Sequence, residues 1–154
     1  MNDIAFEWLV PYFLNGKQRL IKAVMVSAVI VFLFDDVFFA SGMLIAAAVL
    51  AVFGFFLFRS WKYEYEYEYV NGDLTVSKII RKEKRKEVYR IDRREIEDFK
   101  NERISEPGCK FLDFTSGRPG APVCTIRAKG SLVYVEPSGE FLREMEKYYR
   151  MAGV

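Results

Sequence analysis

The stretch Tyr63–Ile80, YEYEYEYVNGDLTVSKII, decides the fold of the C-terminal half of this 154-residue chain. Its tyrosines alternate with glutamates, and only an extended strand places these two sets on opposite faces. Asn71-Gly72 follows, and both residues tolerate the positive φ angles of a tight two-residue hairpin turn. The pattern predicts a β-hairpin in which Tyr67 pairs with Val76 and the tyrosine face is buried.

Further strands are expected after this hairpin, where short runs of β-branched and aromatic residues are bounded by glycine, proline or charged turns. They cover residues 86–91, 96–99, 110–114, 122–127 and 132–136. The segment 138–151 reads as a helix with Ser138 as its N-cap. One face of this helix carries Phe141, Leu142, Met145, Tyr148 and Tyr149. Residues 61–154 are therefore predicted to form a domain of seven strands and a C-terminal helix.

Two apolar runs, residues 20–34 and 37–58, precede this domain. The second is uncharged and long enough, as an α-helix, to cross a hydrocarbon core of about 30 Å. The first is shorter. Its alternatives are a re-entrant helix, an interfacial helix or a signal-peptide core. Asp35 and Asp36 are expected to form the polar turn of a transmembrane hairpin over residues 17–60. An intramembrane carboxylate pair for protons or metal is the alternative for them.

Basic residues flank the two runs at both ends: Lys17, Arg19, Lys22, Arg59 and Lys62. By the positive-inside rule, this distribution predicts a multi-pass inner-membrane protein with both termini in the cytoplasm. The aromatic-rich residues 1–16 are expected to lie at the headgroup level of the bilayer. Small residues spaced for close helix packing, within the hairpin or between two copies, are Gly42, Ala46, Ala47 and Ala51.

A dense basic stretch covers residues 81–94 and is diluted by three acidic residues. Its candidate contact residues for anionic lipid headgroups or a partner are Arg81, Lys82, Lys84, Arg85, Lys86 and Arg90. The alternative is a solvated hairpin whose charges pair across strands. The formal net charge of the chain is only +2, so no nucleic-acid partner is expected.

The chain contains no histidine, which removes the commonest general base and metal ligand. Cys109 and Cys124 lie nearly symmetrically about the Gly117-containing turn, in positions that allow them to face each other on neighbouring strands. Two thiols without histidine cannot complete a closed zinc site, so buried reduced thiols are expected. Motifs for phosphate loops, dinucleotides and catalytic nucleophiles are absent. No catalytic residue, metal site or cofactor is therefore predicted.

The order of elements resembles that of bacterial membrane-anchored proteins with a pleckstrin-homology-like (PH-like) domain. The YEYEYxNGxLxVxKI pattern, found here within Tyr63–Ile79, is similar to that of small bacterial membrane proteins. The resemblance implies an α+β membrane protein: a two-helix transmembrane hairpin, then a seven-stranded PH-like barrel or sandwich plugged by the C-terminal helix. It brings no catalytic residues with it.

Lipid-binding members of the wider superfamily hold a phosphoinositide headgroup with basic residues in a long loop between their first two strands. Here that connection is expected to be the two-residue turn beside Asp73, so a pocket of this type is not expected.

The leading functional hypothesis is a non-catalytic interaction or scaffold module at the inner leaflet, which docks a protein partner or another copy of itself. The second is a sensor that binds anionic lipid or a small ligand through residues 81–94. An enzyme of unknown class is the third.

Overall fold

The structure, a computed structural model, describes residues 4–39 and 42–152. Small parts of the predicted N-terminal segment (residues 1–3) and of the second apolar run (residues 40–41) lie outside the described residues. The chain divides into two compact units. A β unit contains the residues up to Tyr12 and those from Tyr63 onward, and a helical unit contains Phe13–Lys62.

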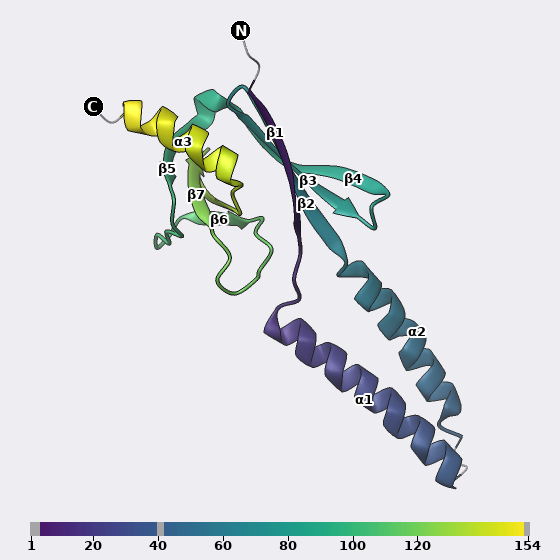
Figure 1. The fold of residues 1–154 in the computed structure, drawn as a ribbon. Coiled ribbons are helices and arrows are strands. Elements are labelled where there is room, and N and C mark those ends of the chain that lie inside the picture. The colour runs from purple at the N-terminus through teal and green to yellow at the C-terminus, as the bar shows by residue number, and fades with distance from the viewer. Residues whose placement is uncertain (1–3, 40–41, 153–154) are drawn as a thin grey trace. The chain divides into compact units, whose positions relative to one another are not determined.

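The β unit contains two four-stranded sheets and a C-terminal helix (Figure 1). The first sheet is antiparallel throughout and has the order β1 (Ala5–Pro11), β2 (Tyr63–Val70), β3 (Asp73–Ile80), β4 (Lys84–Ile91). The second has the order β5 (Ile96–Lys100), β7 (Cys124–Ala128), β8 (Ser131–Val135), β6 (Lys110–Asp113), with β6 parallel to β8. A single 3₁₀ turn, Arg93–Glu95, joins β4 to β5, and helix α3 (Gly139–Ala152) ends the described chain.

The predicted β2–β3 hairpin is confirmed in its register. Tyr67 pairs with Val76 and Tyr69 with Leu74, and all four side chains are buried. Asn71 and Gly72 have φ angles of 53° and 106°. The turn therefore uses the positive-φ conformations that these two residues tolerate.

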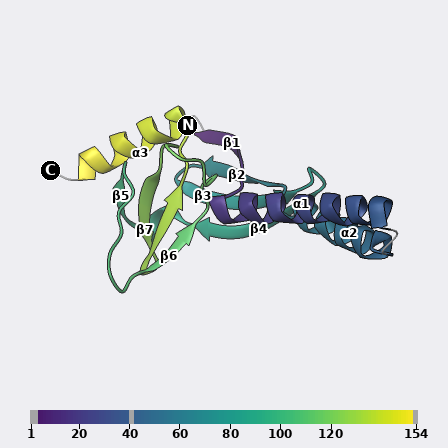
Figure 2. The ribbon, with the colours of Figure 1, turned by 90° about the horizontal axis from the view of Figure 1, so that it is seen from below.

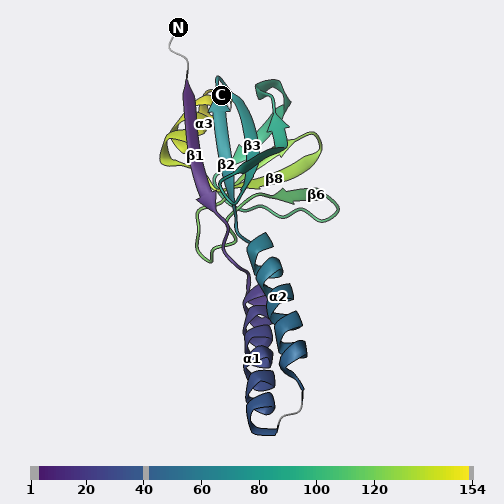
Figure 3. The ribbon, with the colours of Figure 1, turned by 90° about the vertical axis from the view of Figure 1, so that its right-hand side faces the viewer.

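The N-terminal segment corrects two expectations. Residues 5–11, expected at the headgroup level, form strand β1, which pairs with β2 along its whole length (Figure 3). The seven strands predicted within residues 61–154 are present as β2 to β8, and β1 adds an eighth among the described residues. The connection between the first two strands of the sheet is residues 12–62, and not the two-residue turn beside Asp73. Strand β1 was missed because its partner lies far along the chain, although Phe6, Trp8 and Val10 alternate as strand residues do.

Both sheets share one apolar core, which α3 closes at one end. Phe141 of α3 is fully buried, and its ring centre lies 5.2 Å from Trp8, 5.2 Å from Tyr69 and 6.3 Å from Phe99. The ring thus joins the first sheet to β5, beside which α3 lies (Figure 2). The Oγ of Ser138 accepts a hydrogen bond from the Phe141 amide at 3.1 Å, which confirms the predicted N-cap.

The helical unit contains α1 (Gly16–Phe39) and α2 (Leu44–Ser60), which pack side by side. None of the helices in the described residues combines the length and the apolar character needed to cross a membrane. Helix α2 has 17 residues, which rise only about 26 Å. Helix α1 has 24 residues, but its basic first turns and Asp35-Asp36 leave an uncharged middle of about 18 Å. The predictions of a transmembrane hairpin and of a multi-pass inner-membrane protein are therefore wrong.

Replacing Phe141 with alanine should lower the free energy of unfolding of the β unit by about 3–5 kcal/mol, because the substitution leaves a cavity between the sheets and α3. Urea unfolding followed by near-ultraviolet circular dichroism measures the change. Phe111→Ala is the matched control, since Phe111 is 63% exposed on β6, and should change stability by no more than about 0.5 kcal/mol. Equal effects of the two substitutions would contradict this role of Phe141.

Candidate functional site

The β3–β4 hairpin ends in a basic tip, residues 81–88, whose side chains are all exposed. Arg81 and Lys82 turn the chain with φ angles of 58° and 60°. A bulge between β3 and β4 leaves Val88 without a partner on β3, because Val76 pairs with Tyr89 and Ser77 with Glu87. Beyond this bulge neither face of β4 is covered.

Arg85 is the member of the basic tip that the sheet neutralises. Its Nε lies 2.6 Å from Glu66 Oε2, and its Nη2 donates to Glu68 Oε2 at 3.0 Å. Both glutamates are on β2, so these ion pairs hold β4 to a strand that is not its neighbour in the sheet. The expectation that some charges pair across strands is met at this residue.

The other predicted basic residues are less engaged. Arg90 lies 3.8 Å from Asp92, a loose and exposed pair. Within the described residues, ion pairs are absent from four side chains of the tip: Arg81, Lys82, Lys84 and Lys86. The tip is thus a cluster of solvated cations with no internal counter-charge beyond Glu83 and Glu87.

Glu66 has an unusual environment for a carboxylate on the outer face of a sheet. The residue is only 6% exposed. Burial is the main cause that raises the pKa of Glu66, and a side-chain hydrogen bond with Glu7 raises it further, whereas the positive charge of Arg85 acts in the opposite direction. Glu7 belongs to β1. The contact between Glu7 and Glu66 therefore depends on the pairing of β1 with β2, which the sequence analysis did not predict.

The predicted packing residues of the helical unit are distributed unevenly. Ala47 is buried between the helices, Ala46 and Ala51 are exposed, and Gly42 precedes α2 with a φ of 75°. The second buried small residue of α2 is Gly54, where an added Cβ would lie 3.3 Å from the Met25 side chain. Ala47 and Gly54 are seven residues apart, about two helical turns, so a four-residue spacing of small residues does not identify this pair.

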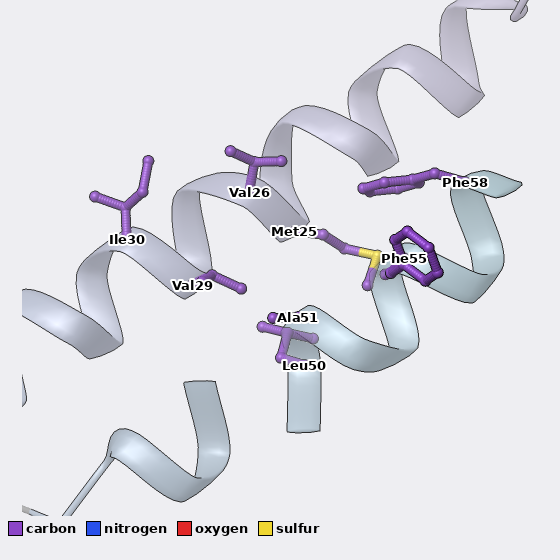
Figure 4. A pocket seen from close by; sticks show the side chains of 9 residues that line it. Met25, Val26, Val29, Ile30, Leu50, Ala51, Phe55 and Phe58 are labelled. Carbon is purple, nitrogen blue, oxygen red and sulfur yellow. The ribbon is translucent and has the colours of Figure 1, made fainter. Parts of the chain in front are cut away.

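An apolar groove of about 320 Å³ follows the junction of the two helices (Figure 4). Met25, Val26, Val29 and Ile30 line it from α1, and Leu50, Ala51, Gly54, Phe55 and Phe58 line it from α2. No titratable side chain lines the groove, so it offers shape and apolar surface but no catalytic group.

The two cysteines do not form a redox or metal site. Both are free. Cys109 directly precedes β6, and β8 separates β6 from β7, which carries Cys124, so the two thiols do not lie on neighbouring strands. Burial raises the pKa of Cys124 to about 12, which keeps it an unreactive thiol. Cys109 is half-buried, and its thiol donates to Glu106 Oε2 at 3.5 Å. In the described part of the chain no cluster of three or more cysteine, aspartate or glutamate side chains has the geometry of a metal site.

A polar hollow of about 420 Å³ lies between the 115–121 loop and Arg103. The Arg103 guanidinium is held by Asp113 at 2.5 Å and lies over the Tyr134 ring, 4.5 Å from its centre. The Arg103 side chain beside this hollow is therefore engaged in structural contacts.

Two sheets around one core, closed at one end by a C-terminal helix, define this chain as a PH-like domain protein. A family profile described as "Bacterial PH-like domain (DUF6106)" matches residues 2–153, and the chain belongs to this family. The match confirms the resemblance found in the sequence, and it runs through the helical hairpin as well as the sheets. Curated proteins and solved structures gave no match.

Glu66→Gln should raise the free energy of unfolding at pH 7. A carboxyl whose pKa is higher in the folded than in the unfolded chain penalises folding once the pH exceeds its unfolded pKa, and glutamine removes that penalty. The gain should shrink as the pH falls toward about 4, where the unfolded carboxyl is also protonated. Glu64→Gln, on the same strand and face but not buried, should show a smaller effect. A loss of stability in Glu66→Gln at pH 7 would contradict the prediction.

The two thiols should differ in reactivity. In the folded protein a maleimide reagent should label Cys109 and leave Cys124 unmodified, because Cys124 is fully buried. Mass spectrometry of the labelled chain counts the modified sites. The Cys109→Ser variant should remain unlabelled until denaturant is added, and its rapid labelling under native conditions would disprove the assignment.

Proposed function

We propose that this PH-like domain is a non-catalytic interaction module that contacts anionic lipid headgroups through the basic tip. The observation that supports the proposal is the set of four exposed cations, Arg81, Lys82, Lys84 and Lys86, which have no ion pair within the described residues. PH-like domains commonly act as modules that bind lipids or proteins, and the family match supports a function of this kind.

The geometry of the tip favours a surface over a small ligand. A small ligand needs a concave site that removes most of its surface from water. Here Lys84 and Lys86 share one face of β4, since by register they lie opposite Ile80 and Lys78, and Arg81 and Lys82 lie in the turn of the exposed hairpin. Such an arrangement suits a layer of negative charges better than one molecule.

The expected affinity is modest. Each basic residue near an anionic lipid surface contributes about 1 kcal/mol, so four residues contribute about 4 kcal/mol, which corresponds to a dissociation constant of about 1 mM. The tip by itself therefore supports reversible contact, and a second contact is needed for firm attachment. Docking to a protein partner, the leading expectation from the sequence, stays a prediction.

A charge-reversed tip tests the proposal. The full-length chain with Lys82→Glu, Lys84→Glu and Lys86→Glu should lose about 100-fold in affinity for phosphatidylglycerol-containing vesicles at low salt, measured by co-sedimentation. Its residual binding to pure phosphatidylcholine vesicles should equal that of the unmodified chain. The matched control reverses three exposed lysines outside the tip, Lys100, Lys110 and Lys147, and should retain most of the affinity.

Three outcomes would contradict the proposal. Equal losses in the two triple variants would show that only net charge matters. Equal binding of the unmodified chain to charged and neutral vesicles would show that headgroup charge has no role. Unchanged vesicle binding by the tip variant, together with lost binding to poly-glutamate, would assign the tip to an acidic protein partner instead.

A further inference from the structure

The helical unit exposes an unusual amount of apolar side chain. From Leu20 to Phe56 its exposed large apolar residues show 41–79% of their surface. In α2 these side chains surround the helix, whose buried residues are only Ala47 and Gly54. A helix that is apolar on all sides needs a covering surface, since monomeric proteins in water rarely expose contiguous apolar patches of this kind.

The groove between the helices has the form of a docking surface for another helix. Side chains from both helices border it (Figure 4). On the α2 side Gly54 and Ala51 also line it, and neither carries a side chain larger than a methyl group. Helix packing places the ridge of side chains of one helix into such a groove of another. A third apolar helix is therefore a suitable occupant of the groove.

The charges at the two ends of the helical unit identify which helix fits. The end at which the chain enters and leaves is basic, with Lys17, Arg19, Lys22, Arg59 and Lys62, and the opposite end carries Asp35 and Asp36. Arg19 and Asp36 are about 26 Å apart along α1, which is well beyond the Debye length of about 8 Å at physiological salt. The two ends therefore do not neutralise each other within one hairpin.

We propose that two copies of this chain pair through their helical hairpins in antiparallel orientation. The groove of each hairpin receives a helix of the second copy, and the acidic end of each lies beside the basic end of the other. A twofold axis places an acidic end beside a basic end at both ends of the pair, because the same surface is used twice. Parallel pairing would place like charges together at both ends, and a partner without this charge pattern would lack the attraction at one end or both.

Cysteine crosslinking of the full-length chain tests the orientation. In a Cys109→Ser background, Leu20→Cys places a thiol near the basic end of α1, and Val37→Cys places one near the acidic end; both sites are exposed. A mixture of the two variants should give crosslinked dimers with a short bismaleimide. Val37→Cys alone should give none, because its two thiols would be about 26 Å apart in the antiparallel pair. Efficient crosslinking of Val37→Cys to itself would overturn the proposal.

Charge exchange tests the cause of pairing. Asp35→Lys with Asp36→Lys should raise the dissociation constant of the dimer at least about tenfold, measured by analytical ultracentrifugation. Adding Lys17→Glu, Arg19→Glu, Lys22→Glu, Arg59→Glu and Lys62→Glu to the same chain reverses both ends and should restore pairing. Far-ultraviolet circular dichroism should be the same for all variants. A monomer in detergent-free buffer would overturn the proposal, as would assembly that requires lipid vesicles, since lipid would then cover the apolar surface.

Discussion

The tight turn at Asn71-Gly72 is the constraint on which the β unit depends. It sets the register in which Tyr67 faces Val76, and a slip of one residue would move the tyrosines of β2 outward and its glutamates into the core. In the observed register, the Tyr67 ring stacks on Trp8 at 5.0 Å, and the Tyr67 hydroxyl donates to the Phe114 carbonyl. Tyr69 in turn contacts Phe141 of α3. The first strand, the last helix and the loop after β6 therefore all pack against side chains whose direction this turn determines.

The same alternation that builds the core also shapes the charged surface. The glutamates of β2 lie on the outer face, where Glu66 and Glu68 hold Arg85 and no other cation of the basic tip. The bulge opposite Val76 and Ser77 interrupts the pairing of β3 with β4, and the first residues of β4, which lie beyond it, are not covered by the core. A basic cluster with little internal counter-charge results, even though the net charge of the chain is only +2.

The helical hairpin is inserted between two strands that are neighbours in the sheet. The amide of Tyr12 donates to the Tyr63 carbonyl at 3.1 Å, and the two rings stack with their centres 4.4 Å apart. Because the chain leaves and re-enters the sheet at adjacent points, the insertion does not interrupt β1–β2 pairing. The family match covers the insertion too. The chain thus carries two chemically different surfaces, one basic and one apolar, on two separate units.

The sequence by itself determined the features that depend on near neighbours. These are the β2–β3 hairpin and its register, the approximate positions of β4 to β8, and the Ser138 cap of α3. The basic cluster at residues 81–90 was also identified from the sequence. Only the tertiary structure decided that residues 5–11 form a strand, that β6 lies parallel to β8, and which cation the sheet neutralises. It also set the lengths of α1 and α2, which overturned the transmembrane interpretation. The physical reason is the sequence separation of the interacting residues. Turns, caps and alternation act within a few residues. The hydrogen bond from the Ile4 amide to the Asn71 side chain joins residues 67 apart, so it forms only when the sheet has formed.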